Sequence, residues 1–206
     1  MMKANDNIAK DIDKDKILSN VEKVCCVLLD ALLIDYKNDH NTKETPKRLA
    51  KMFVNEVFHG RYTERPRVTH FPNVKNVDEI YTVGPITVRS ACAHHFCPIF
   101  GSVWIGVRPS ENIIGLSKFH RITEWVMARP QIQEEAVVML ADELESLIKP
   151  LGLAVIMKAT HTCITWRGVK DNESTMISSV MRGEFLTSIH QKEEFLRLIR
   201  GQGFDS

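Results

Sequence analysis

Residues 90–100, with the sequence SACAHHFCPIF, contain four side chains of the types that bind metal ions. Cys92 and His95 have the Cys-x-x-His spacing, which lets a thiolate and an imidazole reach one ion from a strand end or a turn. Beside them stand His94 and Cys97, which could bind the same ion or act on a substrate next to it. This stretch therefore predicts a metal site whose remaining ligands come from elsewhere in the chain.

A second candidate pair, His161 and Cys163, lies in the apolar segment 153–165. The pattern of this segment predicts a β-strand, and residues two apart on a strand project on the same side. Core packing would account for either residue alone, but the pair gains weight from the first cluster. Cys163 is the natural third ligand beside Cys92 and His95, because thiolates and imidazoles are the ligands that Zn²⁺ prefers.

The number of ligands decides what such a zinc ion could do. Three protein ligands leave one coordination position for water, as in catalytic zinc sites, whereas four ligands close the site and make it structural. Cys97 or His161 could supply a fourth ligand. The spacing alone leaves both versions open.

The hydrophobic pattern predicts the elements that must position these ligands. A helix is expected at 17–33, and a second one is expected to be capped by Thr45 and to end at Gly60. Ser117 is expected to cap a third helix. This order of elements favours an α+β fold, with an antiparallel β-sheet and helices on one face. The expected strands are 80–95, 102–109, 153–165 and 174–185, and the later helices are 116–130, 131–150 and 191–200.

The same pattern divides the chain into three segments. Residues 1–15 are polar and are expected to form a disordered or loosely attached N-terminal tail. Residues 16–60 are expected to form a helical segment, and residues 61–206 a catalytic domain that contains both candidate metal-binding stretches.

The composition is that of a globular protein without a large charged surface. The chain has 206 residues, with 27 Lys and Arg against 26 Asp and Glu, which argues against nucleic acid or a membrane as partner. No apolar run approaches the roughly 20 residues that span a bilayer, and the charged N-terminus lacks the apolar core of a signal peptide. We therefore expect the five cysteines to be reduced and the protein to be cytoplasmic.

Five motifs occur in one order along the chain: ETPKRLAKMFVNEVFHG, CAHHF, GLSKFHRI, RPQIQEE and ATHTCITWRGV. Together they resemble the GTP cyclohydrolase I family, and the resemblance covers roughly residues 17–200. Because several independent motifs stand in the family's order, the resemblance is far more specific than any one motif would be.

The resemblance implies an enzyme that hydrolyses GTP to 7,8-dihydroneopterin triphosphate and formate with a bound Zn²⁺. It also implies the tunnelling fold (T-fold), in which the antiparallel sheets of neighbouring subunits join into a β-barrel ring. In this family five subunits form a ring, two rings stack into a homodecamer, and the active sites lie between subunits. We expect one subunit to supply the metal and Lys118, and a neighbour to supply Arg48.

The family pattern also implies roles for individual residues. It matches Cys92, His95 and Cys163 to the zinc ligands, and His94 and His161 to catalytic histidines beside the metal. It matches residues around the ribose and triphosphate to Ser117, Lys118, Arg121, Arg167 and Arg48. It matches residues near the guanine to Gln133 and Glu134. Ser117 and Gln133 are also expected to act in catalysis.

The sequence departs from the family pattern at two positions. The family usually has a glutamate where this chain has Ala93 and an arginine where it has Glu135. We hypothesise that the two positions form an ion pair in other members. Losing the acid alone would leave a partly buried arginine unpaired, at a cost of several kcal/mol. Losing both partners together avoids that cost.

Two other functions are compatible with the fold that we expect. One is a GTP-binding or pterin-binding regulatory protein without turnover, and the other is a related tunnelling-fold enzyme that acts on another purine or a pterin. The sequence keeps all the expected zinc ligands and both histidines, which argues against the first. It also keeps the triphosphate cluster, which a pterin without phosphates would not need.

Overall fold

The computed structural model describes residues 12–204 of the chain. These residues form two compact units, with the boundary between Glu64 and Arg65. The expected N-terminal tail lies mostly outside the described residues, although the first helix already begins at Lys14. No helix within 12–204 is both long enough and apolar enough to cross a membrane.

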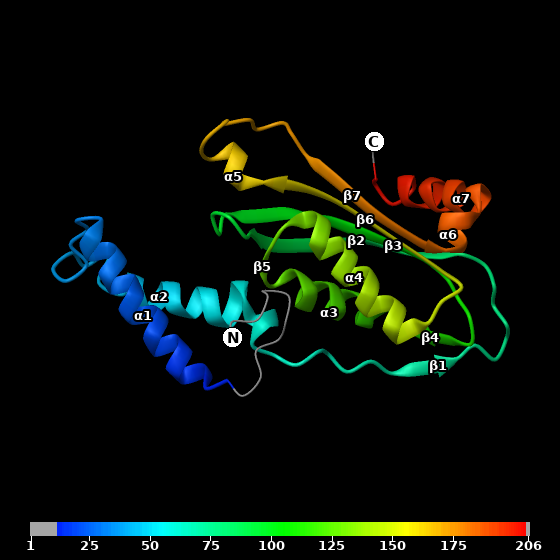
Figure 1. Ribbon diagram of the computed structural model, residues 1–206, viewed down its shortest axis with the longest axis horizontal. Helices are drawn as coiled ribbons and strands as arrows, with labels where there is room; N and C mark the ends of the chain where they lie inside the picture. Colours follow the sequence, from blue (N-terminus) through cyan, green and yellow to red (C-terminus); the bar gives the residue numbers. More distant parts are fainter. Residues whose placement is uncertain (1–11, 205–206) are drawn as a thin grey trace. The chain divides into compact units, whose positions relative to one another are not determined.

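The first unit is helical, as the sequence predicts. It contains α1 (Lys14–Ala31) and α2 (Thr45–Lys51), which contact each other (Figure 1). The chain continues from α2 into a π-helical turn, Met52–Val57, and a 3₁₀ turn, His59–Arg61. The second predicted helix therefore exists, but only its first part is an α-helix.

Two predicted helix caps were wrong. Glu44 rather than Thr45 precedes the first turn of α2, and no side chain caps it. Gly115 rather than Ser117 precedes α3 (Leu116–Met127), so Ser117 is already the second residue of that helix. Serine and threonine are strongly preferred at N-caps, but a cap contributes only about 1 kcal/mol, which other contacts of the entering chain can outweigh.

The second unit is built on a five-stranded sheet with the strand order β5-β2-β3-β6-β7 (Figure 1). Neighbours among the four long strands are antiparallel, whereas β5 is short and runs parallel to the end of β2. A separate antiparallel pair joins β1 (His70–Pro72) and β4 (Asn112–Ile114). The strands of the main sheet are β2 (Tyr81–Cys92), β3 (Pro98–Arg108), β5 (Pro130–Gln131), β6 (Gly152–His161) and β7 (Met176–Gly183).

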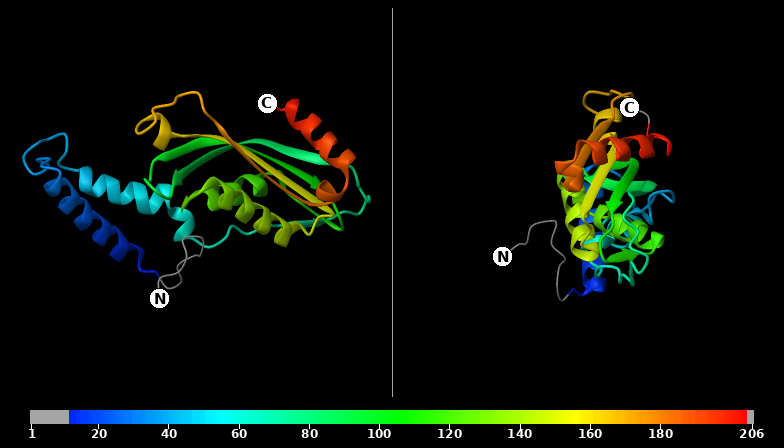
Figure 2. Two further views of the ribbon diagram at one scale, coloured as in Figure 1. Left: turned by 45° about the horizontal axis from the view of Figure 1, so that its top comes forward. Right: turned by 90° about the vertical axis from the view of Figure 1, so that its right-hand side faces the viewer.

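Helices α3 and α4 (Gln133–Ile148) cover one face of this sheet (Figures 1 and 2). Alternate residues of β3, namely Val103, Ile105 and Val107, are completely buried. Their partners on β6 share this face because paired residues of antiparallel strands point the same way. The prediction of an α+β fold with helices packed on an antiparallel sheet is therefore confirmed, with α3 and α4 on one face.

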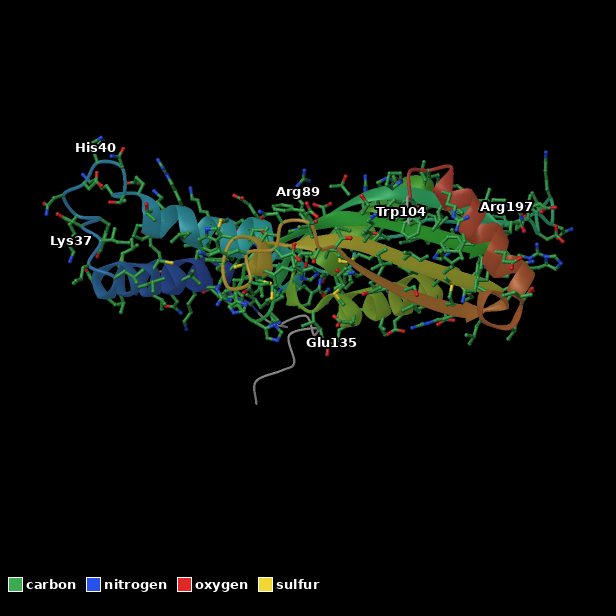
Figure 3. All side chains as sticks on the ribbon, turned by 90° about the horizontal axis from the view of Figure 1, so that it is seen from above. Lys37, His40, Arg89, Trp104, Glu135 and Arg197 are labelled. Carbon is green, nitrogen blue, oxygen red and sulfur yellow. The ribbon has the colours of Figure 1, made fainter. Side chains whose placement is uncertain are left out.

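The opposite face carries a smaller cover, formed by a helix that was expected at 191–200 but not on this face. Helix α7 (Ile189–Arg200), which follows the short helix α6 (Glu184–Thr187), lies over one end of it. Figure 3 shows Trp104 of β3 beside this helix. The cluster that seals α7 against the sheet consists of Trp104, Ala154, Ile156, Phe185, Phe195, Ile199 and Phe204.

We expect Phe195→Ala to destabilise the second unit more than a surface change on the same helix. The Phe195 side chain is fully buried and meets the ring of Phe185 edge-on, with 5.5 Å between ring centroids. Phe→Ala in a core typically costs about 3–5 kcal/mol, because the cavity left behind collapses only in part. Urea unfolding would measure the loss, with Leu198→Ala as the control, since Leu198 is 40% exposed. Equal losses in both variants would contradict this packing.

Candidate metal centre and active site

Cys92 lies at the junction between β2 and the turn that leads to β3. The backbone N–H of Cys92 donates to the carbonyl of Cys97 at 2.9 Å, and the N–H of Phe96 donates to the carbonyl of Cys92 at 2.8 Å. Phe96 adopts a left-handed backbone conformation with φ 53° to close this turn. The turn thus presents His94 and His95 at its exposed end, while Cys92 and Cys97 are buried at its base.

Cys163 reaches the same end of the sheet from β6. The strand was expected to extend to residue 165, but it ends at His161, and Thr162–Thr165 forms a single helical turn, α5. His161 and Cys163 are therefore not neighbours on one strand face, and that prediction was wrong. The register of β3 against β6 pairs Ile99 with His161, which sets Cys163 beside the β2–β3 turn.

These two segments bring together the three predicted metal ligands. The ligand atoms of Cys92, His95 and Cys163 all lie within 4.8 Å of one another. Among residues 12–204, these three side chains form the group that could hold a metal ion. Neither Cys97 nor His161 belongs to this group. Two thiols and an imidazole are a donor set that suits zinc.

The electrostatics of the two thiols also favour a cation. Burial raises the pKa of the Cys163 thiol, and the neighbouring Cys92 and Cys97 raise it further. Because cysteine binds a metal ion as its thiolate, a metal at Cys163 would offset this cost by displacing the thiol proton. A three-ligand group with this character can bind a divalent ion and leave a coordination position open.

Two further histidines flank the group. The Nδ1 atom of His94 lies 3.6 Å from the Sγ atom of Cys92, and its ring is 6.3 Å from that of His95. The Nε2 atom of His161 lies 2.8 Å from the Oε1 atom of Gln133, the first residue of α4. Burial lowers the pKa of His161, and the carboxylate of Glu134 opposes that shift. Glu134 follows directly after Gln133, the partner of His161, along α4.

Comparison with known proteins gives one clear result. Residues 21–200 match the family described as GTP cyclohydrolase I. The chain belongs to the GTP cyclohydrolase I family. It is thus a member of an enzyme family, and its sheet of antiparallel strands with α3 and α4 on one face is the tunnelling fold expected of GTP cyclohydrolase I.

Individual relatives carry the same family name. The chain is 37% identical to "GTP cyclohydrolase 1" of Actinobacillus pleuropneumoniae serotype 5b over 188 residues, which cover 91% of this chain and 86% of that protein. It is also 37% identical to the protein of that name from Edwardsiella ictaluri, over 94% of this chain and 86% of the relative. A solved structure of the archaeosine synthase QueF-Like in the apo form aligns with 58% of this chain and 97% of its own at 12% identity, with a TM-score of 0.40.

Arg167 is the residue of the expected GTP cyclohydrolase I triphosphate cluster that the structure places next to the metal group. Its Nη1 atom donates to the Nε2 atom of His95 at 2.9 Å. A guanidinium is always a donor, so this Nε2 atom presents its lone pair. Arg167 thus contacts one of the three candidate metal ligands directly.

Three other expected substrate residues are not beside the metal group within one subunit. Ser117, Lys118 and Arg121 lie in the first two turns of α3, whereas the end of α3 at Met127 leads into β5, which pairs with Cys92 and its neighbour. Ten residues of helix correspond to about 15 Å, so Ser117 is about that far from this end. The expectation that one subunit sets Lys118 beside the metal was therefore wrong.

Arg48 and Glu135 complete the set of positions that the sequence singled out. Arg48 lies on α2 in the first unit, where it is exposed. Glu135 is exposed on the first turn of α4, and its side chain is labelled in Figure 3. The hypothesis that the positions of Ala93 and Glu135 form an ion pair in other family members stays a prediction.

The sequence missed the arrangement around Gln133. Its side chain is buried at the junction of α4, β6 and β7, and it contacts His161, 28 residues away along the chain. No periodic pattern links a residue at a helix start to one at a strand end, so spacing could not reveal this contact. The one clue was that Gln133 falls on the apolar face of an amphipathic helix, where a buried polar side chain needs a hydrogen-bond partner.

Proposed function

We propose that this chain converts GTP and water into 7,8-dihydroneopterin triphosphate and formate, with a zinc ion held by Cys92, His95 and Cys163. The observation that carries this proposal is the three-ligand group, formed by two distant segments, with His94 3.6 Å from Cys92 and His161 two residues before Cys163. When bound, zinc supplies a water molecule that ionises near neutral pH and can attack a carbon such as C8 of the purine.

The chain's own residues would manage the protons of this reaction. Attack at C8 requires a proton at N7 of the purine, and a histidine whose pKa lies near 7 suits that transfer. His161 and His94 both stand beside a candidate ligand, His161 through its position at the end of β6. We assign proton transfer to these two histidines, and to Ser117 the proton transfers at the ribose after ring opening.

The charged residues would bind and select the substrate. Glu134 is exposed and follows Gln133, the partner of His161, and a carboxylate there can accept hydrogen bonds from N1–H and the 2-amino group of guanine, which adenine lacks. The triphosphate would be bound by the cationic residues Arg48, Lys118, Arg121 and Arg167, with free backbone N–H groups of the first turn of α3 assisting.

The position of Lys118 and Arg121 supports a site shared between subunits. They lie in the part of α3 away from the metal group, so a neighbouring subunit would supply them together with Ser117. The sheet also has open edges, since β7 is an edge strand and β5 covers only the last two residues of β2. Unpaired strand edges invite pairing, and head-to-tail pairing around an axis closes a ring. We infer a homo-oligomer of ten subunits in two stacked rings of five. A cytoplasmic location is also part of this proposal.

The direct test is to incubate the purified protein with GTP and Zn²⁺ and to measure formate and the dihydropterin chromophore. Stoichiometric appearance of both is expected, and both should be absent when a chelator removes the metal. Binding of GTP without either product would instead favour the regulatory function, and activity on another purine or a pterin but not on GTP would favour the related enzyme.

Sedimentation of the purified protein should show a particle much larger than a dimer. Because each site needs residues from a neighbour, dissociated subunits should lose activity in parallel with the loss of the large species. Parallel sedimentation and turnover assays across a dilution series would measure both. A fully active monomer would contradict the shared site.

A further inference from the structure

The orientation of the Gln133 side-chain amide is fixed by its surroundings. Its Nε2 atom lies 3.2 Å from the carbonyl of Met157, 3.1 Å from the carbonyl of Met176 and 3.2 Å from the hydroxyl of Ser178. Backbone carbonyls accept hydrogen bonds but cannot donate them. Turning the amide over would set its oxygen against two carbonyl oxygens, so the nitrogen must face the strands and the oxygen must face away from them.

This orientation determines which nitrogen of His161 carries hydrogen. The Oε1 atom of Gln133 faces the Nε2 atom of His161 at 2.8 Å, and an amide oxygen can only accept. Nε2 must therefore be the donor, in the neutral ring as well as in the imidazolium. Nδ1 is left as the nitrogen that takes no part in this contact.

The position of Gln133 also limits what else it can do. The residue is 1% exposed, and the two hydrogens of its amide are taken up by acceptors on β6 and β7. A group so enclosed has no hydrogen left to offer a purine. The family resemblance matched Gln133 to a residue near the guanine, but its surroundings point to a partner inside the protein.

We infer that Gln133 is a positioning residue, which acts through His161 rather than on the substrate. It accepts from the Nε2–H of His161 and so fixes both the tautomer and the orientation of the ring. This inference rests on the proposed function, because it concerns the same proton transfer. It also explains the use of glutamine, since the side chain must donate to two carbonyls and accept from an imidazole, which no apolar or acidic residue of this length does.

A purely structural role is the competing explanation. Gln133 links the start of α4 to β6 and β7, so its loss would also loosen the packing of the helix against the sheet. Ser178→Ala provides a matched control, because it removes an acceptor on the strand side of the amide and leaves the contact to His161 intact. A structural role predicts that both variants lose activity only as far as they lose stability.

The first experiment compares steady-state kinetics of Gln133→Met and Ser178→Ala. We expect Gln133→Met to lower kcat about 10- to 100-fold, the usual effect of removing a partner that orients a functional imidazole, with KM nearly unchanged. Ser178→Ala should keep kcat near that of the unaltered protein. Gln133→Glu restores an acceptor for Nε2–H, so it should retain more kcat than Gln133→Met even though its second oxygen faces the strand carbonyls. If Gln133→Met does not fold, the comparison of Gln133→Glu with Ser178→Ala takes its place.

The second experiment is a double-mutant cycle with His161→Ala, supported by the affinity for GTP measured by calorimetry. If Gln133 acts through His161, Gln133→Met should have no further effect on kcat in the His161→Ala background, and the Kd for GTP should stay within about twofold. A full further loss in that background, or a tenfold weaker Kd, would overturn the inference and return Gln133 to the guanine. An unaltered protein that forms no dihydropterin would refute the proposed function and the inference with it, whereas an active protein with either result above would refute the inference alone.

Discussion

Cys92→Ser and Cys163→Ser should each yield a protein that retains no zinc and turns over no GTP. Each removes one of three ligands from an open site, and a serine hydroxyl does not replace a thiolate on zinc. The two sulfur atoms belong to the group whose ligand atoms lie within 4.8 Å of one another. Metal content of the purified variants by atomic emission, with formate release from GTP in parallel, would measure both losses.

Cys97→Ser is the control for this pair. Cys97 is buried at the base of the same turn, but it lies outside the three-ligand group. Its replacement should leave one zinc ion per subunit and most of the activity. Stoichiometric zinc in Cys92→Ser or Cys163→Ser would exclude that residue as a ligand, and loss of zinc from Cys97→Ser would make Cys97 the missing one.

His161→Ala should retain its zinc and lose the chemistry. His161 lies outside the three-ligand group, and its Nε2 atom contacts Gln133, so its removal should take no ligand from the metal. General acid–base groups typically contribute 10²- to 10⁴-fold, and a loss of about that size is expected in kcat. Single-turnover formation of the dihydropterin, with metal content determined on the same sample, would measure it.

The exposed His190 of α7 supplies the comparison, and His190→Ala should leave both zinc and turnover unchanged. A His161→Ala protein that arrives without metal would show instead that His161 is a ligand and that the site is a closed one.

The long elements of the second unit could be predicted because each carries its own periodic signal. The β6–β7 hairpin follows from two β-rich runs, and the two strands do pair, with Gly152 opposite Gly183 at one end. Helix α5 could not be predicted in this way. Its residues Thr162, Ile164 and Thr165 are β-branched and favour a strand, so the helical turn arises from tertiary structure that overrides local preference.

The metal group could be predicted in part for a different reason. Cysteine and histidine are rare and chemically distinctive, so Cys92, His95 and Cys163 stand out by residue type alone. Gln133 and Arg167 have no such signature, and their contacts to His161 and His95 depend on how separate elements pack. The distance of Lys118 from the metal group likewise follows from the direction of α3, which sequence spacing does not encode.

The pairing of Ile99 with His161 makes metal uptake a reporter of how the chain folds. A slip of one residue between β3 and β6 would move Cys163 by about 3.3 Å and reverse the faces of the alternating side chains. Metal–ligand distances tolerate only about 0.2 Å, so a slipped chain could not complete the site. β3 and β6 are separated in sequence by α3 and α4, and pairing across so long an intervening segment is a slow event in folding. In a refolding experiment, zinc binding should therefore occur after hydrophobic collapse. Its rate should report the formation of the native register between β3 and β6.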